Sequence, residues 1–454
     1  MNNFFEDDNS KPSIIITPIQ TLQLKKWLFS QPSYIQHWIK STGFDATHGT
    51  RIQVPNLDGS LNCVLFGINE NPTLWDWSNL PTGLAPNVYR LNKLTNNTDT
   101  KNAALAWALS LYKFDRYRQP KSPSPVLIKP SNFDANLVIS TYLVRDLINT
   151  PANDLGPQDL TKVSKKIAKE IDAKVSVIVG EDLLKKGYPL IHAVGRAHTR
   201  APQLIDIKWG NLNSPKVTLI GKGVCFDTGG LNLKPTSGMA LMKKDMGGAA
   251  HALGLARMIA AEKLNVRLRV LIPAVENSIA GDAMRPGDVL TSRKGITVEI
   301  GNTDAEGRLI LADVLTEAST ENPSLIIDFA TLTGAARVAL GTELPALFSN
   351  DDHLASSILL AGIKEYDPLW RLPLWNGYKE QIKGKIADLS NSGSSHLGGA
   401  ITAALFLEHF VDPKIPWAHI DIMAWNTSSK PGRPEGGEAM GMRAVFNALC
   451  KKFK

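Results

Sequence analysis

Two carboxylates lie close together in a polar turn near the middle of the chain, at Asp304 and Glu306. The turn separates an apolar alternating run from a strongly helical run, within residues 296–315 (ITVEIGNTDAEGRLILADVL). Side chains two residues apart leave an extended segment on the same side, so the two anions repel each other unless a cation or a shared proton neutralises them. Arg308 supplies one positive charge against two. The stretch fits either an exposed acidic turn that caps a helix or a metal site.

A second stretch, residues 218–248, brings further charged residues into glycine-rich loops. It contributes Lys222, Asp227, Lys234 and Asp245 after a strand-like apolar run. Carboxylate oxygens suit hard divalent cations and also hold zinc or manganese. If these charges were only buried salt bridges, four carboxylates would face few cations, which is costly away from water. The glycines do not form the GxxxxGK[ST] pattern of a phosphate-binding loop, so a nucleotide-binding fold is disfavoured.

Taken together, these motifs resemble those of the leucyl aminopeptidase (cytosol aminopeptidase) family of two-metal exopeptidases. The resemblance rests on NTDAEGRL, GKGVCFDTGG and KKDMGG, with RDLINTPAND from 145, PAVENSIAGDAMRPGDVL from 273, DFATLTGA from 328 and KIADLSN from 385. It covers residues 140 to 425 and is weak before residue 130. It implies an enzyme that removes the first residue from short peptides with a free N-terminus.

The resemblance implies two divalent metal ions per subunit, Mn²⁺ or Zn²⁺, with Mg²⁺ or Co²⁺ as alternatives. Asp227 and Glu306 would bridge the ions, Asp304 would complete one site, and Lys222 and Asp245 would complete the other. An amine binds a metal only when it is deprotonated, so Lys222 is expected to have a lowered pKa. A bridging hydroxide shared by the two ions would be the nucleophile.

Two further cationic residues match family residues that do not bind metal. Lys234 matches a protonated lysine that polarises the scissile carbonyl group. Arg308 matches an arginine that holds bicarbonate, whose oxygens act as the general base, and a planar guanidinium group suits this anion. The implied cofactors are therefore two metal ions and bicarbonate.

The pocket for the first substrate side chain departs from the family pattern. The resemblance assigns to it the residues Met242, Thr331, Leu332, Gly334, Met423 and Asn426. Met423 is larger than the usual alanine, and Asn426 puts a polar group where a leucine side chain would rest. The sequence therefore leaves the preferred first residue open.

Helix and strand patterns alternate beyond residue 130, which is typical of an α/β fold with a mostly parallel, helix-covered central sheet. In such sheets the reactive loops lie at the C-terminal strand ends, where the charged loops fall. We expect a small N-terminal α/β domain over residues 1–128 and a larger catalytic domain over 129–454. Residues 1–12 are predicted to be disordered, 119–131 (QPKSPSPVLIKPS) to form a proline-rich connector, and 391–400 to form a flexible loop.

Composition places the chain among ordinary globular proteins, with 43% hydrophobic and 20% charged residues. It has no run of about 18 apolar residues, and its N-terminus lacks the order of a secretory signal, so we expect no membrane partner and a cytoplasmic location. Basic residues number 50 against 43 acidic, which gives a net charge of +7. They are scattered along the chain, so nucleic-acid binding is disfavoured.

Two other functions remain open at the level of sequence. A two-metal phosphoryl hydrolase would use the same carboxylates. A basic oligomer could bind DNA as a secondary role, because some relatives are thought to do so. The resemblance also implies assembly as a homohexamer.

Overall fold

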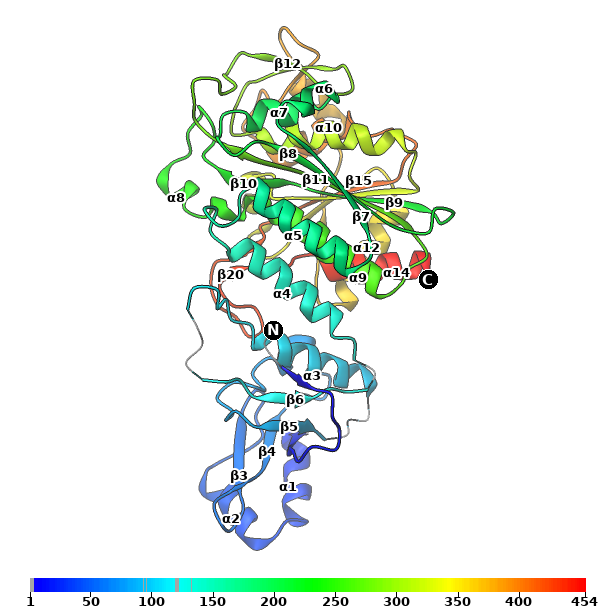
Figure 1. Cartoon of the computed structure of the whole chain (residues 1–454). Helices are drawn as coiled ribbons and strands as arrows, with labels where there is room; N and C mark the ends of the chain where they lie inside the picture. The colour runs from blue at the N-terminus through cyan, green and yellow to red at the C-terminus, as the bar shows by residue number, and fades with distance from the viewer. Residues whose placement is uncertain (1–3, 93, 95, 119–121, 132) are drawn as a thin grey trace. The chain divides into compact units, whose positions relative to one another are not determined.

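The structure, a computed structural model, describes residues 4–92, 94, 96–118, 122–131 and 133–454 (Figure 1). Contacts between residues divide the chain into two compact units. The smaller unit contains Met1–Val138 and Ser428–Glu435, and the larger contains Ile139–Thr427 and Gly436–Lys454. We describe each unit by itself.

The smaller unit contains a six-stranded sheet with the strand order β1-β6-β5-β2-β4-β3. Only β3 runs antiparallel to its neighbour among these paired strands. The elements are β1 (Phe5–Glu6), β2 (Ile14–Ile19), α1 (Thr21–Phe29), α2 (Ser33–Ser41), β3 (Arg51–Pro55), β4 (Leu61–Gly67), the 3₁₀ helix η1 (Leu74–Trp77), β5 (Val88–Leu91), α3 (Asn97–Ser110) and β6 (Val126–Ile128).

Strands β1 and β6 correct two expectations about the ends of this unit. Phe5, in the tail predicted to be disordered, is buried and lies edge-on to the Phe133 ring at 5.1 Å, and it pairs with Leu127 in the sheet. The prediction of disorder is therefore wrong for β1, because burial of this aromatic ring and strand pairing offset the cost of ordering the segment. Part of the predicted proline-rich connector is likewise strand β6, whereas residues 1–3 and 119–121 lie outside the described part of the chain.

The larger unit is built on a nine-stranded sheet with the order β16-β15-β18-β14-β9-β11-β8-β7, in which β10 also pairs with β11. Its strands are β7 (Lys174–Val179), β8 (Gln203–Gly210), β9 (Lys216–Gly221), β10 (Gly223–Asp227), β11 (Arg267–Asn277), β14 (Leu325–Ala330), β15 (Ala346–Ser349), β16 (Trp370–Arg371) and β18 (Trp417–Asp421). The central pairs are parallel, and the antiparallel pairs involve β7, β8 and β15. The predicted α/β class with a mostly parallel sheet is confirmed.

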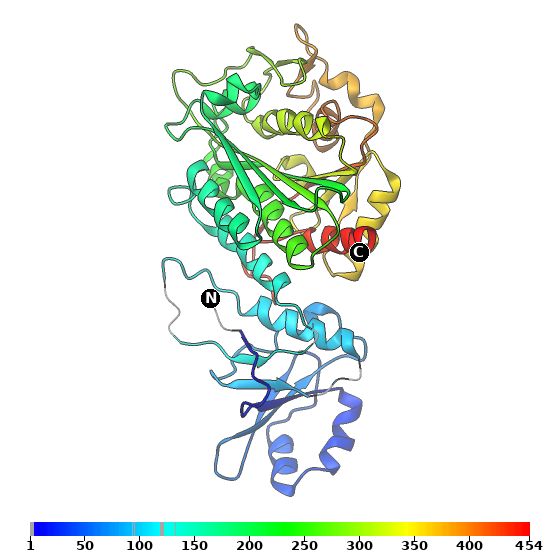
Figure 2. The same cartoon turned by 45° about the vertical axis from the view of Figure 1, so that its right-hand side comes forward.

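Helices cover both faces of this sheet, as Figures 1 and 2 show. Helices α5 (Pro157–Glu170) and α9 (Gly247–Ala261) lie on one face, and α7 (Pro189–Gly195) and α10 (Glu306–Thr320) lie on the other. Strands β9 and β14 are almost wholly buried, which explains their continuous apolar sequences. Ile310, Leu311 and Val314 of α10 pack into the same core.

The remaining elements extend the larger unit around this sheet. They are α4 (Asn136–Asn149), α6 (Asp182–Lys185), α8 (Thr236–Met239), η2 (Met242–Met246), β12 (Val289–Thr291), β13 (Thr297–Glu299), α11 (Gly334–Leu340), α12 (Asp352–Lys364), η3 (Asn376–Ile382), β17 (Leu389–Ser390), α13 (Gly399–Glu408), β19 (Trp425–Asn426), β20 (Gly436–Gly437) and α14 (Met442–Phe453). Among the described residues, no helix has both the length and the apolar composition needed to cross a membrane.

Candidate metal centre

The candidate site lies where several strands of the larger sheet end. Lys222 follows β9, Asp227 is the last residue of β10, and Thr331 follows β14. Because β9 lies parallel to both β11 and β14, the loops after these strands open at the same edge of the sheet. The turn between β13 and α10 adds Asp304 and Glu306, and η2 adds Asp245.

A cavity of about 340 Å³ collects these residues. Eleven of the thirteen side chains predicted for the site line it: Lys222, Asp227, Lys234, Met242, Asp245, Asp304, Glu306, Arg308, Thr331, Leu332 and Gly334. Met423 and Asn426 are not among the lining residues. The structure thus brings the two charged stretches of the sequence together, although about 60 residues separate them.

Two lysine ammonium groups lie between the carboxylates. Lys222 Nζ lies 2.8 Å from Asp245 Oδ2 and 2.9 Å from Glu306 Oε1. Lys234 Nζ lies 2.9 Å from Asp227 Oδ2 and 2.5 Å from Asp304 Oδ1. The carboxylates of the cavity therefore stabilise positive charge at two separate positions, which the two ammonium groups occupy.

Hydrogen bonds from the surrounding chain fix one oxygen of two carboxylates and leave the other oxygen directed at a lysine. Asp227 Oδ1 accepts hydrogen bonds of 2.8 Å from both Gly229 N and Asn277 Nδ2. Asp245 Oδ1 accepts one of 2.8 Å from Thr331 Oγ1. This outer layer sets the orientation of each carboxylate before any ligand arrives.

The side chain of Lys222 passes directly over the first turn of α10. A Cβ atom at Gly307 would lie 2.6 Å from Lys222 Cε and 2.8 Å from its Nζ, closer than real Cβ contacts. Glycine at this position therefore leaves the space through which Lys222 reaches Glu306. This lack of space for a side chain explains why glycine occupies this position of the NTDAEGRL motif.

Burial and mutual repulsion raise the pKa values of two carboxyl groups of the site. Burial raises the pKa of Glu306 to about 8, and the nearby charge of Asp227 adds to the effect. Burial, with the charge of Asp245, raises the pKa of Asp227 to about 6. Two carboxyl groups that resist ionisation in one small cavity indicate a site short of positive charge.

Lys222 shows the opposite direction from the one expected. Burial alone would lower its pKa, but the charges of Asp245, Glu306 and Asp227 outweigh burial and raise it. The lowered pKa was expected with two divalent ions beside the amine, so it stays a prediction for the metal-bound protein. Ligation through Nζ would require divalent charge nearby to offset the carboxylates.

The donor set fits a divalent cation. Asp227, Asp245 and Glu306 each offer one oxygen atom, these atoms lie within 4.8 Å of one another, and all three residues are buried. Asp245 Oδ2, Asp304 Oδ1 and Glu306 Oε1 accept no hydrogen bond of good geometry despite the nearby lysines. Buried oxygens of this kind need a compensating cation, and carboxylates match the ligands that manganese and magnesium prefer.

Arg308 lies in the first turn of α10 and lines the same cavity. Burial lowers its pKa to about 10, and its Nε is buried without a hydrogen-bond partner. A buried guanidinium group with an unused donor suits a small planar anion, which is the group that the resemblance assigns to it.

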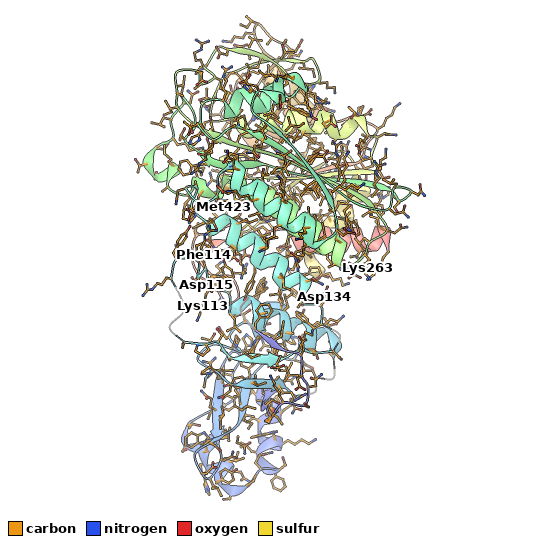
Figure 3. All side chains as sticks on the ribbon, viewed as in Figure 1. Lys113, Phe114, Asp115, Asp134, Lys263 and Met423 are labelled. Carbon is orange, nitrogen blue, oxygen red and sulfur yellow. The ribbon has the colours of Figure 1, made fainter. Side chains whose placement is uncertain are left out.

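Two predicted pocket residues are not among the residues that line the cavity. Met423, labelled in Figure 3, is buried, and its sulfur lies 3.7 Å from Arg337 Nη1. Asn426 lies in β19, and its Nδ2 donates a hydrogen bond of 2.8 Å to Glu438 Oε2. The chain between them has a positive φ of 56° at Ala424. The assignment of both residues to the pocket for the first substrate side chain stays a prediction. Ile422 lines the cavity instead.

The cavity also contains residues that were not predicted from the sequence. They are Asn302, Ala305, Lys244, Thr333, Ala335, Arg337, Gly399 and Ile422. Lys244 is almost fully buried, and burial lowers its pKa to about 8. In the sequence, only its position next to Asp245 in KKD could have indicated that Lys244 lies at the site.

A buried asparagine holds the acidic turn in place. Asn391 Oδ1 accepts hydrogen bonds from the backbone N–H groups of Gly301 and Asn302, and its Nδ2 donates one of 2.7 Å to Asn302 O. The segment 391–400 was predicted as a flexible loop, but its first residue is fully buried. Polar side chains that clamp a distant turn resemble ordinary loop residues in a sequence.

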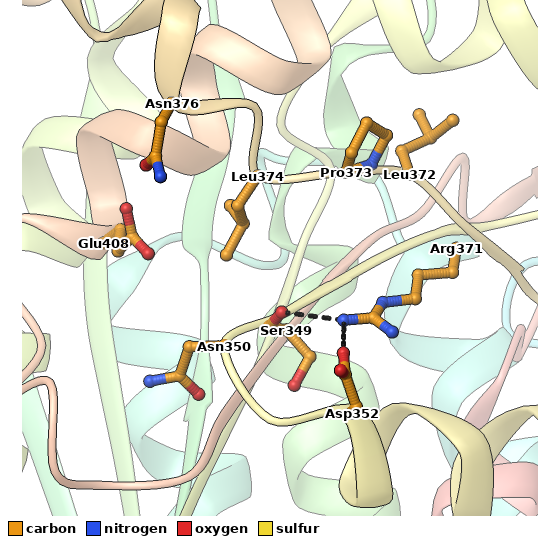
Figure 4. A pocket seen from close by; sticks show the side chains of 9 residues that line it. All are labelled: Ser349, Asn350, Asp352, Arg371, Leu372, Pro373, Leu374, Asn376 and Glu408. Atoms are coloured by element: carbon orange, nitrogen blue, oxygen red, sulfur yellow. Dashed lines mark hydrogen bonds and ion pairs between the residues drawn. The ribbon is translucent and has the colours of Figure 1, made fainter.

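A second cavity of about 520 Å³ in the larger unit provides a contrast (Figure 4). Ser349, Asp352, Arg371 and Glu408 are among its lining residues. Arg371 Nη2 donates to Asp352 Oδ1 and to the backbone oxygen of Ser349. Its arginine is thus already paired, and the candidate cluster of metal-binding carboxylates lies in the other cavity.

Fold and site together define an α/β protein with a buried carboxylate and lysine cluster, suited to divalent cations, at the strand ends of a parallel sheet. A family model described as the catalytic domain of the cytosol aminopeptidase family matches residues 142–446, and one described as the M17 aminopeptidase N-terminal domain matches residues 14–130. The chain belongs to the cytosol aminopeptidase family. The predicted family is confirmed.

Known structures agree along the whole chain. The crystal structure of cytosol aminopeptidase from Coxiella burnetii is 50% identical, with a TM-score of 0.96 and coverage of 99% of each chain. The bottromycin maturation enzyme BotP in complex with Mn is 30% identical, with a TM-score of 0.87, and covers 97% of this chain and 100% of its own. A probable cytosol aminopeptidase of Syntrophotalea carbinolica is 45% identical over 311 residues, 68% of this chain. That match spans 62% of the relative's own length.

Proposed function

We propose that the protein is a metal-dependent aminopeptidase that removes the first residue from peptides with a free N-terminus. The observation that supports this most strongly is the group of three buried carboxylates, Asp227, Asp245 and Glu306, within 4.8 Å of one another in a chain of this family. Three buried carboxylates so close together destabilise the folded protein unless cations compensate them, which favours a role in metal binding.

The cations proposed for this site are two divalent ions, Mn²⁺ or Zn²⁺, with Mg²⁺ or Co²⁺ as alternatives. Asp227 and Glu306 would contact both ions, with Asp304 on one side and Lys222 and Asp245 on the other. The manganese complex of the related BotP supports metal binding at a fold of this kind. Bound there, such a pair supplies an activated water and positive charge for the developing oxyanion.

The cationic side chains would handle the carbonyl oxygen and the proton. Burial lowers the pKa of Lys234, but Asp227 and Glu306 outweigh burial and raise it, so the group keeps its proton at neutral pH. Its ammonium group would donate to the carbonyl oxygen of the scissile bond. Arg308 would hold bicarbonate through its unused Nε donor, and this anion would supply the general base of the reaction.

The decisive experiment compares three kinds of chromogenic substrate with Mn²⁺ or Zn²⁺ added. Aminoacyl p-nitroanilides test the proposed activity, and their N-acetylated forms test the need for a free amine. p-Nitrophenyl phosphate tests the rival phosphoryl hydrolase. Hydrolysis of the free anilides alone, lost after chelation and restored by metal, is the expected result. Turnover of the phosphate ester with no anilide cleavage would reject the proposal.

Assembly and compartment are proposed by analogy. We propose a homohexamer, supported by apolar side chains that lie exposed on the larger unit, among them Val338 at 91%, Leu397 at 80% and Trp375 at 60% exposure. The names of the relatives place them in the cytosol, and we propose the same compartment here. Light scattering coupled to size exclusion tests the assembly, and a monomeric mass would reject it.

A further inference from the structure

Three cations in the wall of the candidate cavity form no ion pair among the described residues. They are Arg308, for which bicarbonate is the proposed partner, Lys244 and Arg337. Lys244 is 4% exposed and makes no side-chain hydrogen bond or ion pair with a described residue. Arg337, in the second turn of α11, donates to the sulfur of Met423, which is a weak acceptor.

Two other cations of the cavity are paired. Lys222 and Lys234 each contact two carboxylates inside the cavity. Arg371, in the second cavity, has Asp352 as its partner (Figure 4).

Lys244 has no such close partner among the described residues. The charges of Asp245 and Asp421 stabilise its ammonium group, but neither carboxylate lies within ion-pair distance. Because a buried cation without a close anion is costly, an anion from outside the chain would stabilise Lys244 further.

The charge balance at the metal centre supports the same conclusion. The four carboxylates of the site, Asp227, Asp245, Asp304 and Glu306, carry four negative charges when ionised. Two divalent cations bring four positive charges, so with both bound the carboxylates are balanced. Lys234 and Arg308 add positive charge to this balance, and Lys244 and Arg337 add more. Asp421 offsets part of the charge near Lys244, and an anionic ligand would neutralise more of it.

The wall around these cations leaves room for a side chain. Gly334 lies beside Arg337, since a Cβ atom at 334 would lie 3.3 Å from Arg337 Nη2. Met242, Ala335 and Ile422 line the cavity near them and supply apolar surface. An aliphatic stem that ends in a negative group matches this combination of apolar wall and cationic donors.

We propose that Lys244 and Arg337 determine specificity by binding the carboxylate of an acidic first residue, so that peptides beginning with glutamate or aspartate are preferred substrates. The inference rests on the proposed aminopeptidase function and adds its substrate class. It replaces the leucine preference that the family name suggests.

The test compares kcat/KM for glutamyl and glutaminyl p-nitroanilide, which differ in charge but hardly in shape. The wild-type protein should prefer glutamyl by about 10- to 100-fold, the range of one or two charge-assisted hydrogen bonds. Lys244→Met and Arg337→Met should each reduce this ratio, mainly by raising KM for the glutamyl substrate. Lys243→Met is the matched control, because that lysine donates to Asn149 O and does not line the cavity.

A charge reversal at Arg337 and a direct binding measurement also test the proposed preference for acidic residues. Arg337 is exposed, so Arg337→Glu should fold and shift preference away from glutamyl towards lysyl substrates. Calorimetric binding of L-glutamate and L-glutamine to the metal-loaded protein gives a readout independent of turnover. Equal kcat/KM for the two anilides, or a glutamyl preference that survives both methionine variants, overturns the inference. Absence of turnover on every aminoacyl substrate overturns the proposed function instead, and the binding comparison then decides whether the anion site exists.

Discussion

Lys222 Nζ and Asp245 Oδ2 lie 2.8 Å apart, and both side chains are almost fully buried. Asp245 is tied at its other oxygen to Thr331, and Lys222 also donates to the backbone oxygen of Thr331 at 3.0 Å. One threonine after β14 therefore positions both the acid and the amine. Both the burial of this cluster and the hydrogen bonds that hold it should therefore affect metal binding.

Replacement of Glu306 by glutamine should separate the metal role of this residue from its effect on stability. The folded-state pKa of about 8 lies above the usual 4.5, so the metal-free folded protein binds more protons than the unfolded chain between these values. Its stability contribution therefore falls as pH rises through this window. Glu306→Gln should abolish turnover and weaken metal binding, yet raise the melting temperature of the chelator-treated protein at pH 8 more than at pH 5.

Calorimetric metal titration and thermal melts at the two pH values check this prediction. Glu262→Gln is the control, because Glu262 pairs with Lys454 at the surface. Unchanged metal affinity in Glu306→Gln would contradict the assignment of Glu306 as a ligand.

Thr331→Val should weaken metal binding without removing a proposed ligand. The substitution keeps the shape of the side chain and deletes the hydrogen bond that orients Asp245. Loss of such an outer contact usually costs about 10- to 100-fold in metal affinity. Metal content after dialysis against a buffered ion series measures the change. Thr316→Val, which removes a bond from Thr316 Oγ1 to Ala312 O within α10, should leave affinity unchanged.

Arg145→Met should destabilise the larger unit strongly. Arg145 donates from Nε and Nη2 to the two oxygens of Glu438, both at 3.0 Å, and both residues are buried. Removal of one partner from such a pair leaves a buried charge and costs about 3 to 5 kcal/mol. Chemical unfolding followed by tryptophan fluorescence checks this, with Lys454→Met at an exposed pair as the control. A loss under 1 kcal/mol would show that Asn426 and the Ala439 N–H stabilise Glu438 without the arginine.

His251 should make the protein sensitive to mild acid. Burial lowers its pKa to about 4, and the neutral ring lies 2.6 Å from Gly247 O through Nδ1 and accepts a hydrogen bond from Met440 N at Nε2. The folded protein binds fewer protons than the unfolded chain between pH 6.5 and about 4. The neutral ring therefore contributes about 3 kcal/mol to the free energy of unfolding above pH 6.5, and this contribution is lost as the pH falls to about 4.

Unfolding free energies of wild type and His251→Gln across this pH range test the contribution. The difference between the two should shrink as pH falls, because only the wild type gains the proton. His353→Gln, on the exposed side of α12, serves as the control. A difference that is constant with pH would show that the ring titrates alike in both states.

The fold and the clustering of the candidate metal ligands were largely predictable because local signals and strand order agree. Continuous apolar runs identified β9, β11 and β14, and charges directly after such runs converge at one edge of a parallel sheet. The Asp304 and Glu306 pair alone fitted a helix-capping turn equally well, and the second charged stretch, residues 218–248, favoured a cation site.

The missed features depend on contacts that local sequence does not encode. β1 and β6 pair across more than a hundred residues, and their own segments contain polar residues or prolines that suggest disorder. Asn391 looks like a surface residue because a loop amide usually is, yet it is fully buried. The left-handed turn at Ala424, next to two predicted pocket residues, also could not be predicted.

Lys244 and Asp245 are neighbours in one short 3₁₀ turn, so a substitution at 244 lies directly beside a candidate metal ligand. Arg337 stands on a separate helix and touches no candidate ligand in the described contacts. Attempts to change the first residue that the proposed peptidase accepts should therefore begin at 337, where a substitution leaves the candidate ligands and their neighbours in the chain unaltered.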